Sequence, residues 1–365
     1  MNDLSRARAS LFRAGTSKGL FFLGDDLPTD LLSRNEFLLA ALGSPDPRQI
    51  DGVGGAHPLT SKIAIVSPSK RESIDVDYLF LQVWPERTEV SDKQNCGNIL
   101  AAVAPFAIEE GLISVQGEMT TVRIWMENTA SVAYATVATP KGKVKYSGSS
   151  RIDGVPGGHQ AIDIEFRDIE GSSCGSLLPT GNVVDVIDGF EVTCTDNGMP
   201  VVCVNAKDLG VVGDESPHEL EEMENLVKRV ESLRLRAGHM MNLGDVTTKS
   251  VPKVSILSPA RQGGVLATRT FIPHRVHEAI GVLGAVSVAS ACLIQGSVAS
   301  KIASIDLEAS TLALNIEHPS GYFTVNCDLE RGQGGVKVSR VSLMRTARLL
   351  MRGEVYVSSQ LENLR

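Results

Sequence analysis

The chain has 365 residues, of which 42% are hydrophobic and 21% charged, with a formal net charge of −8. These proportions are typical of a globular protein in water, and the length allows two domains. No basic stripe is present, which argues against nucleic acid as a partner, and no apolar run approaches the roughly 18 residues of a membrane span.

The six cysteines are scattered along the chain, at Cys96, Cys174, Cys194, Cys203, Cys292 and Cys327. Their spacing matches neither the paired ligands of a zinc site nor a disulfide framework, so we expect no metal and no disulfide. The first eight residues, which include Arg6 and Arg8, lack the apolar core of a signal peptide. A reducing, cytoplasmic location is the expectation.

The first half contains short β-prone runs between turn residues, at 18–23, 62–66, 75–83 and 121–126. A helix is expected from about Asn98 to Glu110, with Gly111 closing it. Its apolar residues lie on all sides, which predicts a helix surrounded by other elements. Glu109 and Glu110 oppose the helix dipole. Packing, rather than end charges, must therefore hold this helix.

The second half repeats the pattern, with β-prone runs at 185–193, 201–204, 253–257 and 322–327. A long apolar segment follows Arg275 and predicts a buried helix between about 279 and 294. A charged, amphipathic stretch from Glu219 to Arg236 predicts a surface helix.

Each half thus combines many strands with one helix too apolar to lie outside. This pattern predicts an α+β fold of two similar lobes, each a curved, mostly antiparallel sheet wrapped around a central helix. Turn residues at 179–182 place the boundary between residues 1–182 and 183–365, and the last strand can return to the first lobe.

Cys96 directly precedes Gly97, Asn98 and the first apolar helix. A thiol at a helix start faces unpaired backbone N–H groups and the positive end of the dipole. That setting favours a thiolate and also binds carboxylates. It indicates an enzyme that acts on a small anionic substrate; the alternative is an inert buried cysteine.

Lys62 follows Thr60 and Ser61 and leads directly into the apolar run 63–66. Desolvation at the start of a strand favours the neutral amine, which is the form that a general base needs. The alternative interpretation is a solvated lysine at a strand end.

A polar, glycine-bounded turn lies between Gly15 and Gly19, and its spacing is not that of a phosphate-binding loop. The glycines allow close backbone approach. A second glycine turn, at 51–55, lacks the spacing of a dinucleotide fingerprint and predicts a tight turn instead. The alternative for the first loop is a plain turn. Neither loop predicts a cofactor.

Several segments, in this order, together resemble a known family: 12–19, 49–55, 59–62, 95–98, 196–200, 241–245 and 272–275. The family is that of the 2-methylaconitate isomerases and 4-oxalomesaconate tautomerases, which have the diaminopimelate-epimerase fold. The runs 153–157, 173–182 and 317–321 most resemble the tautomerases of gallate and protocatechuate breakdown.

The resemblance implies proton transfer without a cofactor on a small unsaturated di- or tricarboxylate, through an enolate-like intermediate. It implies that Lys62 is the base and Cys96 its partner on the opposite side of the substrate. A homodimer is a possible assembly. The expected substrate-binding residues are Arg13, Thr16, Ser17, Lys18, Ser61, Gly97, Asn98, Arg275, Gly284 and Ser287.

The chain departs from the epimerases at the second apolar helix, where 281–287 contains no cysteine and Cys292 lies about two turns deeper. A lysine with one cysteine suits allylic isomerisation or tautomerisation better than a symmetric racemisation. His274 and His277 have a spacing that metal ligands use, but Pro273 precedes them and no third ligand follows.

Three rival activities stay open at this point. They are a 2-methylaconitate cis-trans isomerase, a non-catalytic tricarboxylate-binding protein and a metal-dependent hydratase.

Overall fold

The computed structural model describes residues 4–92, 96–167, 169–306, 309–332 and 335–358, and Asn95 lies outside them. The chain forms two compact units. Unit 1 comprises Met1–Glu165 with Met344–Arg365, and unit 2 comprises Phe166–Leu343.

The division falls at Glu165, whereas the turn residues had placed it after Asn182. The intervening segment is bonded within unit 2. The N–H groups of Ser173 and Cys174 each donate to Oδ2 of Asp196 at 2.8 Å. Turn residues alone could not show which side of the boundary this segment would join.

In unit 1 the strand order is β1-β2-β3-β4-β6-β7-β8-β16, and β16 also pairs with β1, so the sheet closes on itself. The pairs β2–β3 and β4–β6 are parallel, whereas β1–β2, β1–β16, β3–β4 and β6–β7 are antiparallel. The strands are β1 (Leu4–Ala14), β2 (Ser17–Leu23), β3 (Lys62–Pro68), β4 (Val76–Val83), β6 (Met119–Met126), β7 (Ser131–Ala138), β8 (Ala161–Phe166) and β16 (Gly335–Ser358), while β5 (Val90–Ser91) pairs with β4.

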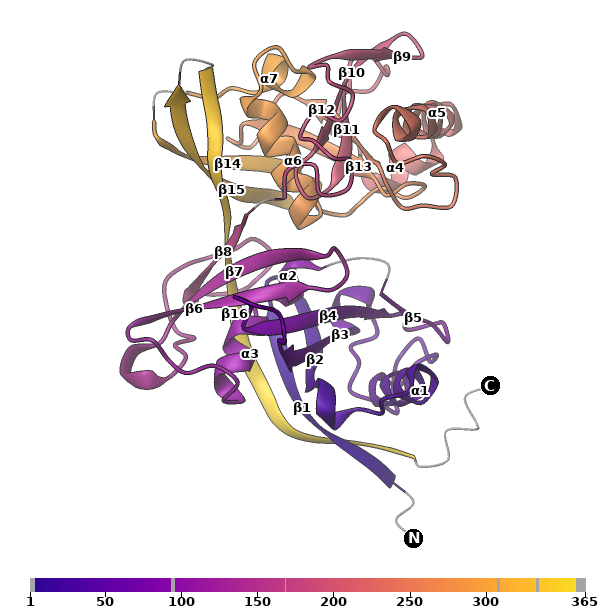
Figure 1. Cartoon of the computed structure of the whole chain (residues 1–365). Coiled ribbons are helices and arrows are strands. Elements are labelled where there is room, and N and C mark those ends of the chain that lie inside the picture. Colours follow the sequence, from indigo (N-terminus) through magenta and orange to yellow (C-terminus); the bar gives the residue numbers. More distant parts are fainter. Residues whose placement is uncertain (1–3, 93–95, 168, 307–308, 333–334, 359–365) are drawn as a thin grey trace. The chain divides into compact units, whose positions relative to one another are not determined.

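The closed sheet surrounds two short helices, α2 (Gly97–Leu100) and α3 (Val103–Glu109) (Figure 1). Phe106 of α3 packs its ring on those of Phe12 and Phe21, with centroids 6.4 and 5.6 Å apart. The longer helix α1 (Leu31–Leu42) packs against β4 and β5. Short 3₁₀ turns are η1 (Gly24–Asp26), η2 (Pro58–Thr60) and η3 (Pro140–Gly142).

The prediction of a single helix from Asn98 to Glu110 is wrong, because the helix is interrupted at residues 101 and 102. Pro105 explains the break, because proline has no N–H to donate to the carbonyl four residues earlier and its ring crowds that carbonyl. The acidic end is compensated, since Arg352 lies 3.2 Å from carboxylate oxygens of both Glu109 and Glu110.

In unit 2 the strand order is β16-β15-β14-β13-β12-β11-β10-β9, to which β16 contributes residues 335–343. These strands surround helix α6 (Val282–Leu293), whose residues are all buried. This confirms the predicted buried helix. The strands are β9 (Asp185–Ile187), β10 (Phe190–Asp196), β11 (Pro200–Asn205), β12 (Lys253–Ser258), β13 (Leu266–Phe271), β14 (Thr311–His318) and β15 (Gly321–Gly332), and α7 (Val298–Ile302) follows α6.

The amphipathic stretch of unit 2 forms two helices, α4 (Pro217–Glu222) and α5 (Glu224–Met240), rather than one. Met223 separates them, because its ψ of 78° is not helical. Ser216 and Glu219 close a capping box at the start of α4. The α+β class, with a mostly antiparallel sheet around a central helix in each unit, is confirmed.

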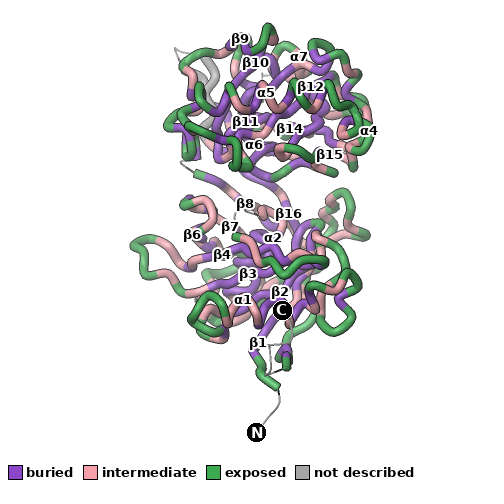
Figure 2. Tube along the Cα trace, turned by 90° about the vertical axis from the view of Figure 1, so that its right-hand side faces the viewer, coloured by how far each residue is buried: buried purple, intermediate pink, exposed green. Residues whose placement is uncertain are grey.

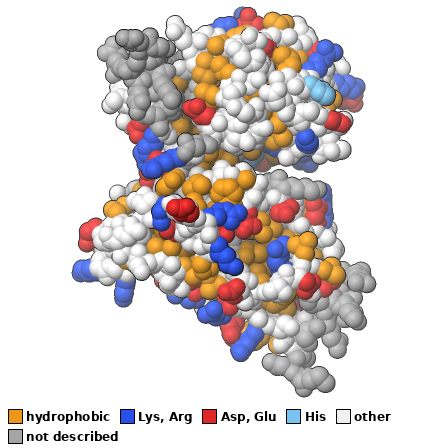
Figure 3. Space-filling view, viewed as in Figure 1, with side chains coloured by type: hydrophobic (Ala, Val, Ile, Leu, Met, Phe, Trp, Pro, Cys, Tyr) orange, Lys and Arg blue, Asp and Glu red, His pale blue; other side chains and the backbone are white. Residues whose placement is uncertain are grey.

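Burial follows the strands and central helices of each unit, while the connecting loops are exposed (Figure 2). On the face drawn in Figure 3, acidic and basic side chains are interspersed. No helix among the described residues is long and apolar enough to cross a membrane.

Asp75 and Arg123 join the start of β4 to β6. Two guanidinium nitrogens and the backbone N–H of Arg123 donate to the carboxylate of Asp75 at 2.6–3.0 Å. Burial alone would raise the pKa of Asp75, but these bonds outweigh it and the net pKa is lowered. The bonds between Asp75 and Arg123 therefore stabilise the fold above the unfolded pKa of about 3.9. This stabilisation is lost as pH falls through the lower pKa of the folded state.

We expect Asp75→Asn to lower the free energy of unfolding by about 1 kcal/mol at pH 7, allowing for solvent screening. The difference from the parent protein should shrink below about pH 4, where the parent carboxylate takes up its proton. Urea unfolding of both proteins at several pH values measures this difference in the free energy of unfolding. A difference that stays constant down to pH 3 would contradict this role.

Candidate active site

Lys62 is the first residue of β3 and is 7% exposed. It pairs with Gly19 on the parallel strand β2 and with Gln82 on the antiparallel strand β4. Its Nζ donates to Oε1 of Gln82 at 2.9 Å and lies 5.1 Å from the centroid of the Phe80 ring. Among the described residues, no carboxylate forms an ion pair with it. The interpretation as a solvated strand-end lysine does not fit this burial.

The orientation of the Gln82 amide is determined by its surroundings. Its Nε2 donates towards the carbonyl oxygens of Pro58, Ser61 and Val83, at 3.0, 3.2 and 3.1 Å. The reversed amide would place Oε1 against these three acceptors and leave them without a donor. The oxygen of Gln82 is therefore held towards Lys62.

Ser61 is wholly buried, and a second glutamine holds it. Its Oγ lies 2.8 Å from Oε1 of Gln49, and Nε2 of Gln49 donates to Oγ of Ser44 at 3.1 Å. A Cβ on Gly54 would lie 2.2 Å from Oε1 of Gln49. The glycine-rich segment 51–55 therefore leaves room for the side chain that positions Ser61.

Cys96 is half-buried and is the residue before α2. Its carbonyl accepts from the N–H of Leu100 at 3.0 Å and faces the hydroxyl of Tyr78 at 3.5 Å. Burial, and secondarily the nearby Cys96, raise the pKa of Tyr78 well above its usual value, so the phenol stays a donor. Because α2 is one turn long, it supplies N–H donors near Cys96 but little macrodipole.

One face of β4 supports both candidate catalytic residues. Tyr78, Phe80 and Gln82 alternate along the strand and therefore point to the same side. Tyr78 contacts the backbone of Cys96, while Phe80 and Gln82 contact Lys62. The sequence interpretation missed all three. The signal that could have found Gln82 was a polar residue that follows Val76, Tyr78 and Phe80 on one apolar face of the strand.

The β1–β2 turn lies against the start of α2. Nδ2 of Asn98 donates to Oγ1 of Thr16 at 3.1 Å. Gly15 has a φ of +54°, and a Cβ there would lie 2.1 Å from Oδ1 of Asn98, so this position requires glycine. On the other side of the turn, Lys18 lies beside Gly55, whose Cβ would be 3.2 Å from its Nζ.

Ser17 is buried, and its Oγ has no hydrogen-bond partner among the described residues. Unit 1 contains most of the residues expected from the sequence, and hydrogen bonds join some of them: Ser61 and Lys62 through Gln82, and Thr16 with Asn98. Ser17, Lys18, Cys96 and Gly97 lie in the same unit.

Arg13, also in unit 1, bonds to another strand, a contact that the sequence did not predict. Its Nη1 donates to the carbonyl and hydroxyl of Thr346 on β16 at 2.6 and 2.8 Å. Burial, with a smaller effect of Arg348, lowers the pKa of Arg13. Its main contacts therefore fasten β1 to β16.

The other three expected binding residues belong to unit 2. Arg275 is largely exposed and pairs with Glu221 at 2.9 Å. Gly284 lies in the first turn of α6, and Oγ of Ser287 donates to the carbonyl of Met199 at 2.7 Å.

The other residues considered from the sequence, Cys292, His274 and His277, have contacts that point to structural roles. Cys292 is buried near the end of α6, and burial raises its pKa well above the usual value. His274 faces Glu231 at 3.9 Å, while Nδ1 of His277 accepts from the N–H of Ala279 at 2.9 Å. No cluster of three or more His, Cys, Asp or Glu side chains suited to a metal occurs among the described residues.

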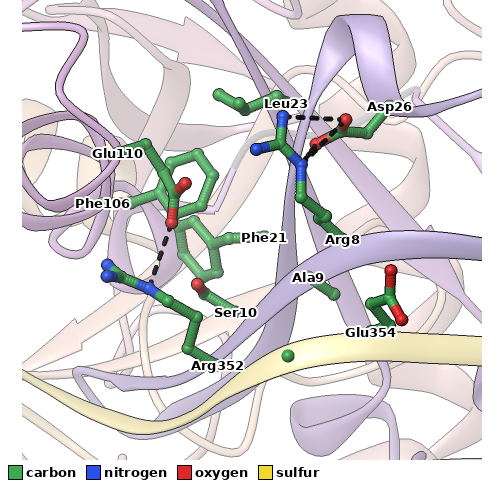
Figure 4. Close-up of a pocket in the computed structure, with 11 residues that line it drawn as sticks. Arg8, Ala9, Ser10, Phe21, Leu23, Asp26, Phe106, Glu110, Arg352 and Glu354 are labelled. Atoms are coloured by element: carbon green, nitrogen blue, oxygen red, sulfur yellow. Dashed lines mark hydrogen bonds and ion pairs between the residues drawn. The ribbon is translucent and has the colours of Figure 1, made fainter.

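A cavity of about 300 Å³ lies elsewhere in unit 1, with Phe21 and Phe106 among its lining residues (Figure 4). Arg8 reaches Asp26 at its edge, and Arg352 reaches Glu110. None of the site residues expected from the sequence lines it. It adjoins Leu23, at the opposite end of β2 from Lys18.

A substitution at Gly19 tests how closely β2 must approach Lys62. A Cβ at this position would lie 2.4 Å from the backbone oxygen of Lys62, a contact that only a shift of the strands can relieve. We expect Gly19→Ala to destabilise unit 1 by about 2 kcal/mol and to lower turnover about tenfold. Gly353→Ala is the matched control, because a Cβ there meets nothing within 4 Å. Thermal unfolding and turnover of both variants measure the effect; equal behaviour would contradict the close approach.

The model of the family described as PrpF protein matches residues 4–358, and the chain belongs to this family. It is an isomerase. It is 56% identical to the (4E)-oxalomesaconate Delta-isomerase of Novosphingobium sp. (strain KA1), over 97% of this chain and 98% of the relative. It is 54% identical to the 4-oxalomesaconate tautomerase of Pseudomonas putida (strain KT2440), over 97% and 96%.

The crystal structure of a methylitaconate-delta-isomerase superposes with a TM-score of 0.84 at 34% identity, covering 99% of this chain and 97% of that one. A hydroxyproline epimerase from Agrobacterium vitis shares the fold alone, with a TM-score of 0.55 at 14% identity, covering 98% and 94%. The epimerase-like fold expected from the sequence is therefore confirmed.

Proposed function

We propose that this isomerase moves a proton and a double bond in 4-oxalomesaconate, by keto–enol tautomerisation or allylic isomerisation, with Lys62 as base and Cys96 as its partner. Two relatives more than half identical over nearly the whole chain bear the names of such enzymes, which supports this substrate. The two names differ in the product, so the product of this chain is a matter for experiment.

The observation that carries the proposal is the environment of Lys62. The amine is buried against a neutral amide and an aromatic ring, with no carboxylate partner among the described residues. The uncharged acceptor orients Nζ without an ion pair, which leaves the amine available to the substrate. Cys96 is tied through Tyr78 to the same face of β4.

In the proposed reaction, Nζ of Lys62 removes a proton from a carbon next to a carbonyl or carboxylate group of the substrate. The C–H electron pair forms a new double bond, and the negative charge moves to the oxygen as an enolate. Protonation of this oxygen gives the enol, and protonation of the distant allylic carbon gives the isomer. Cys96 supplies that second proton, and it receives the proton when the reaction runs in reverse.

The substrate carboxylates need fixed donors close to these two groups. Lys18 supplies a positive charge, and Thr16 and Ser17 supply hydroxyls in the same turn. The backbone N–H groups of Gly97 and Asn98, at the start of α2, have no carbonyl partner within the helix. Charge-assisted bonds from such groups hold a carboxylate more strongly than neutral pairs do.

Proton NMR of the purified enzyme with 4-oxalomesaconate in D₂O tests the proposal. We expect loss of substrate signal, with deuterium entering the carbon that Lys62 deprotonates. Turnover of 2-methylaconitate but not of 4-oxalomesaconate, followed by ultraviolet absorbance, would favour the rival isomerase. Binding without any exchange would favour a carboxylate-binding protein, and loss of activity after extensive chelation would favour a metal-dependent hydratase.

We also propose that the enzyme works in the cytoplasm, in gallate or protocatechuate breakdown, and that it forms a homodimer. The six cysteines, all within the described residues and none in a disulfide, support a reducing compartment. Light scattering after size-exclusion chromatography measures the assembly.

A further inference from the structure

We propose that Gln82 is a positioning residue that sets the proton affinity of Lys62, because it offers the amine one oriented and uncharged acceptor. This inference rests on the proposed role of Lys62 as base. In this role Gln82 does not contact the substrate; it contacts only the amine of Lys62. It acts by orienting the amine and by determining how far the charged form is stabilised.

The geometry supports a dedicated role for this side chain. Gln82 is 2% exposed and stands directly opposite Lys62 in the β3–β4 pairing. Its Nε2 bonds to three backbone carbonyls, so the amide cannot turn without losing them. Two of these carbonyls belong to Pro58 and Ser61, in and after η2, which leads into Lys62. The same amide therefore fixes both the backbone that carries the lysine and the direction of its amine.

The charges around Lys62 explain why a neutral partner matters. Three carboxylates on the elements packed against β3 have other partners: Asp26 pairs with Arg8, Asp77 with Arg71 and Glu109 with Arg352. The titratable side chains on the elements packed against β3 are Lys18 on β2, Asp77 and Tyr78 on β4, His57 at the start of η2, Asp25 and Asp26 on η1, and Glu109 on α3. None of them bonds to Lys62 among the described residues.

As a neighbour of the Lys62 amine, an amide oxygen has an effect between those of a carboxylate and an apolar side chain. A carboxylate in its place would put a full negative charge about 3 Å from the amine and hold the ammonium form, since opposite charges at this range favour ionisation. An apolar side chain would leave the ammonium without an acceptor and favour the neutral amine, but would not orient it. Substitutions of the two kinds should therefore shift the titration of Lys62 in opposite directions.

The test compares Gln82→Glu and Gln82→Met through the pH dependence of kcat/KM for 4-oxalomesaconate. In the parent enzyme the acid limb reports loss of the neutral base. We expect Gln82→Glu to move the midpoint of this limb up by about one unit or more, with activity recovering at alkaline pH. Gln82→Met should move it down by a similar amount, while the plateau kcat falls about tenfold and KM changes little.

Gln116→Glu is the matched control, because it makes the same chemical change at an exposed position of unit 1 and should leave the midpoint unmoved. Both Gln82 variants lose the Nε2 bonds, so both should unfold at a lower temperature. A purely structural role would lower stability and kcat in both without opposite shifts of the limb. Midpoints that stay within about 0.3 unit of the parent, or that move the same way, would overturn the proposal.

A second measurement needs no substrate. The ¹³Cε chemical shift of Lys62, in protein labelled at lysine and assigned with Lys62→Arg, reports protonation of the amine directly. Opposite shifts of this titration in the two variants support the role of Gln82 even if 4-oxalomesaconate is not turned over. Absent turnover with the parent enzyme would instead count against the proposed substrate alone. Unmoved NMR titrations would overturn the inference.

Discussion

Replacing Lys62 by methionine is expected to lower kcat by about 10³-fold, because it removes the group that takes the substrate proton. Methionine has a similar length and no charge, so it can fill the buried space beside Phe80 without leaving a cavity. Substrate affinity should change only a few-fold, since the carboxylates are held by other donors in the proposed site. Ultraviolet turnover measures kcat, and calorimetric titration measures binding.

Lys143→Met provides the control for loss of a lysine in the same unit, because Lys143 is exposed and lies outside the candidate site. It should keep the parent kcat. Lys62→Met enzyme should also fail to exchange the substrate proton with D₂O. Retention of more than about a tenth of the parent kcat would eliminate Lys62 as the base.

Replacing Cys96 by alanine is expected to lower kcat by about 10²-fold, because the second proton transfer loses its group. The first transfer remains, so Lys62 should still exchange the substrate proton with D₂O while product forms slowly. Exchange without turnover would distinguish the partner from the base. Proton NMR follows exchange and product formation in one sample.

Cys292→Ala is the matched control for the thiol, since Cys292 is buried in α6 and has no role in the proposed reaction. It should keep full turnover and lower the thermal midpoint slightly, through lost packing. If Cys292→Ala abolished turnover and Cys96→Ala did not, the unsymmetrical lysine–cysteine pair would be wrong.

Much of the fold followed from local patterns. A helix that is apolar on all sides must be surrounded, and this predicted the central position of α6, all of whose residues are buried. The same argument predicted the central helix of unit 1 but not its interruption before Pro105. The boundary between the units was harder, because the hydrogen bonds of 171–177 to Asp196 depend on contacts distant in sequence.

Local sequence patterns were enough to predict the chemical groups of the candidate site. The residues before Lys62 and after Cys96 are small or polar, the runs beyond them are apolar, and glycines flank the nearby turn. These are local features that can be read without a structure. They identified a buried lysine and a thiol at a helix start, and the structure shows both groups in those settings.

The partners of these groups became visible from the folded chain alone. The pairing of β3 with β4 brings Gln82 to Lys62, and the alternation of β4 places Tyr78 beside Cys96. Likewise, Arg13 bonds to Thr346 and Arg275 to Glu221. Strand register and the pairing of distant segments depend on the packing of the whole unit. For this reason, local sequence patterns named the lysine and the cysteine but not the side chains that hold them.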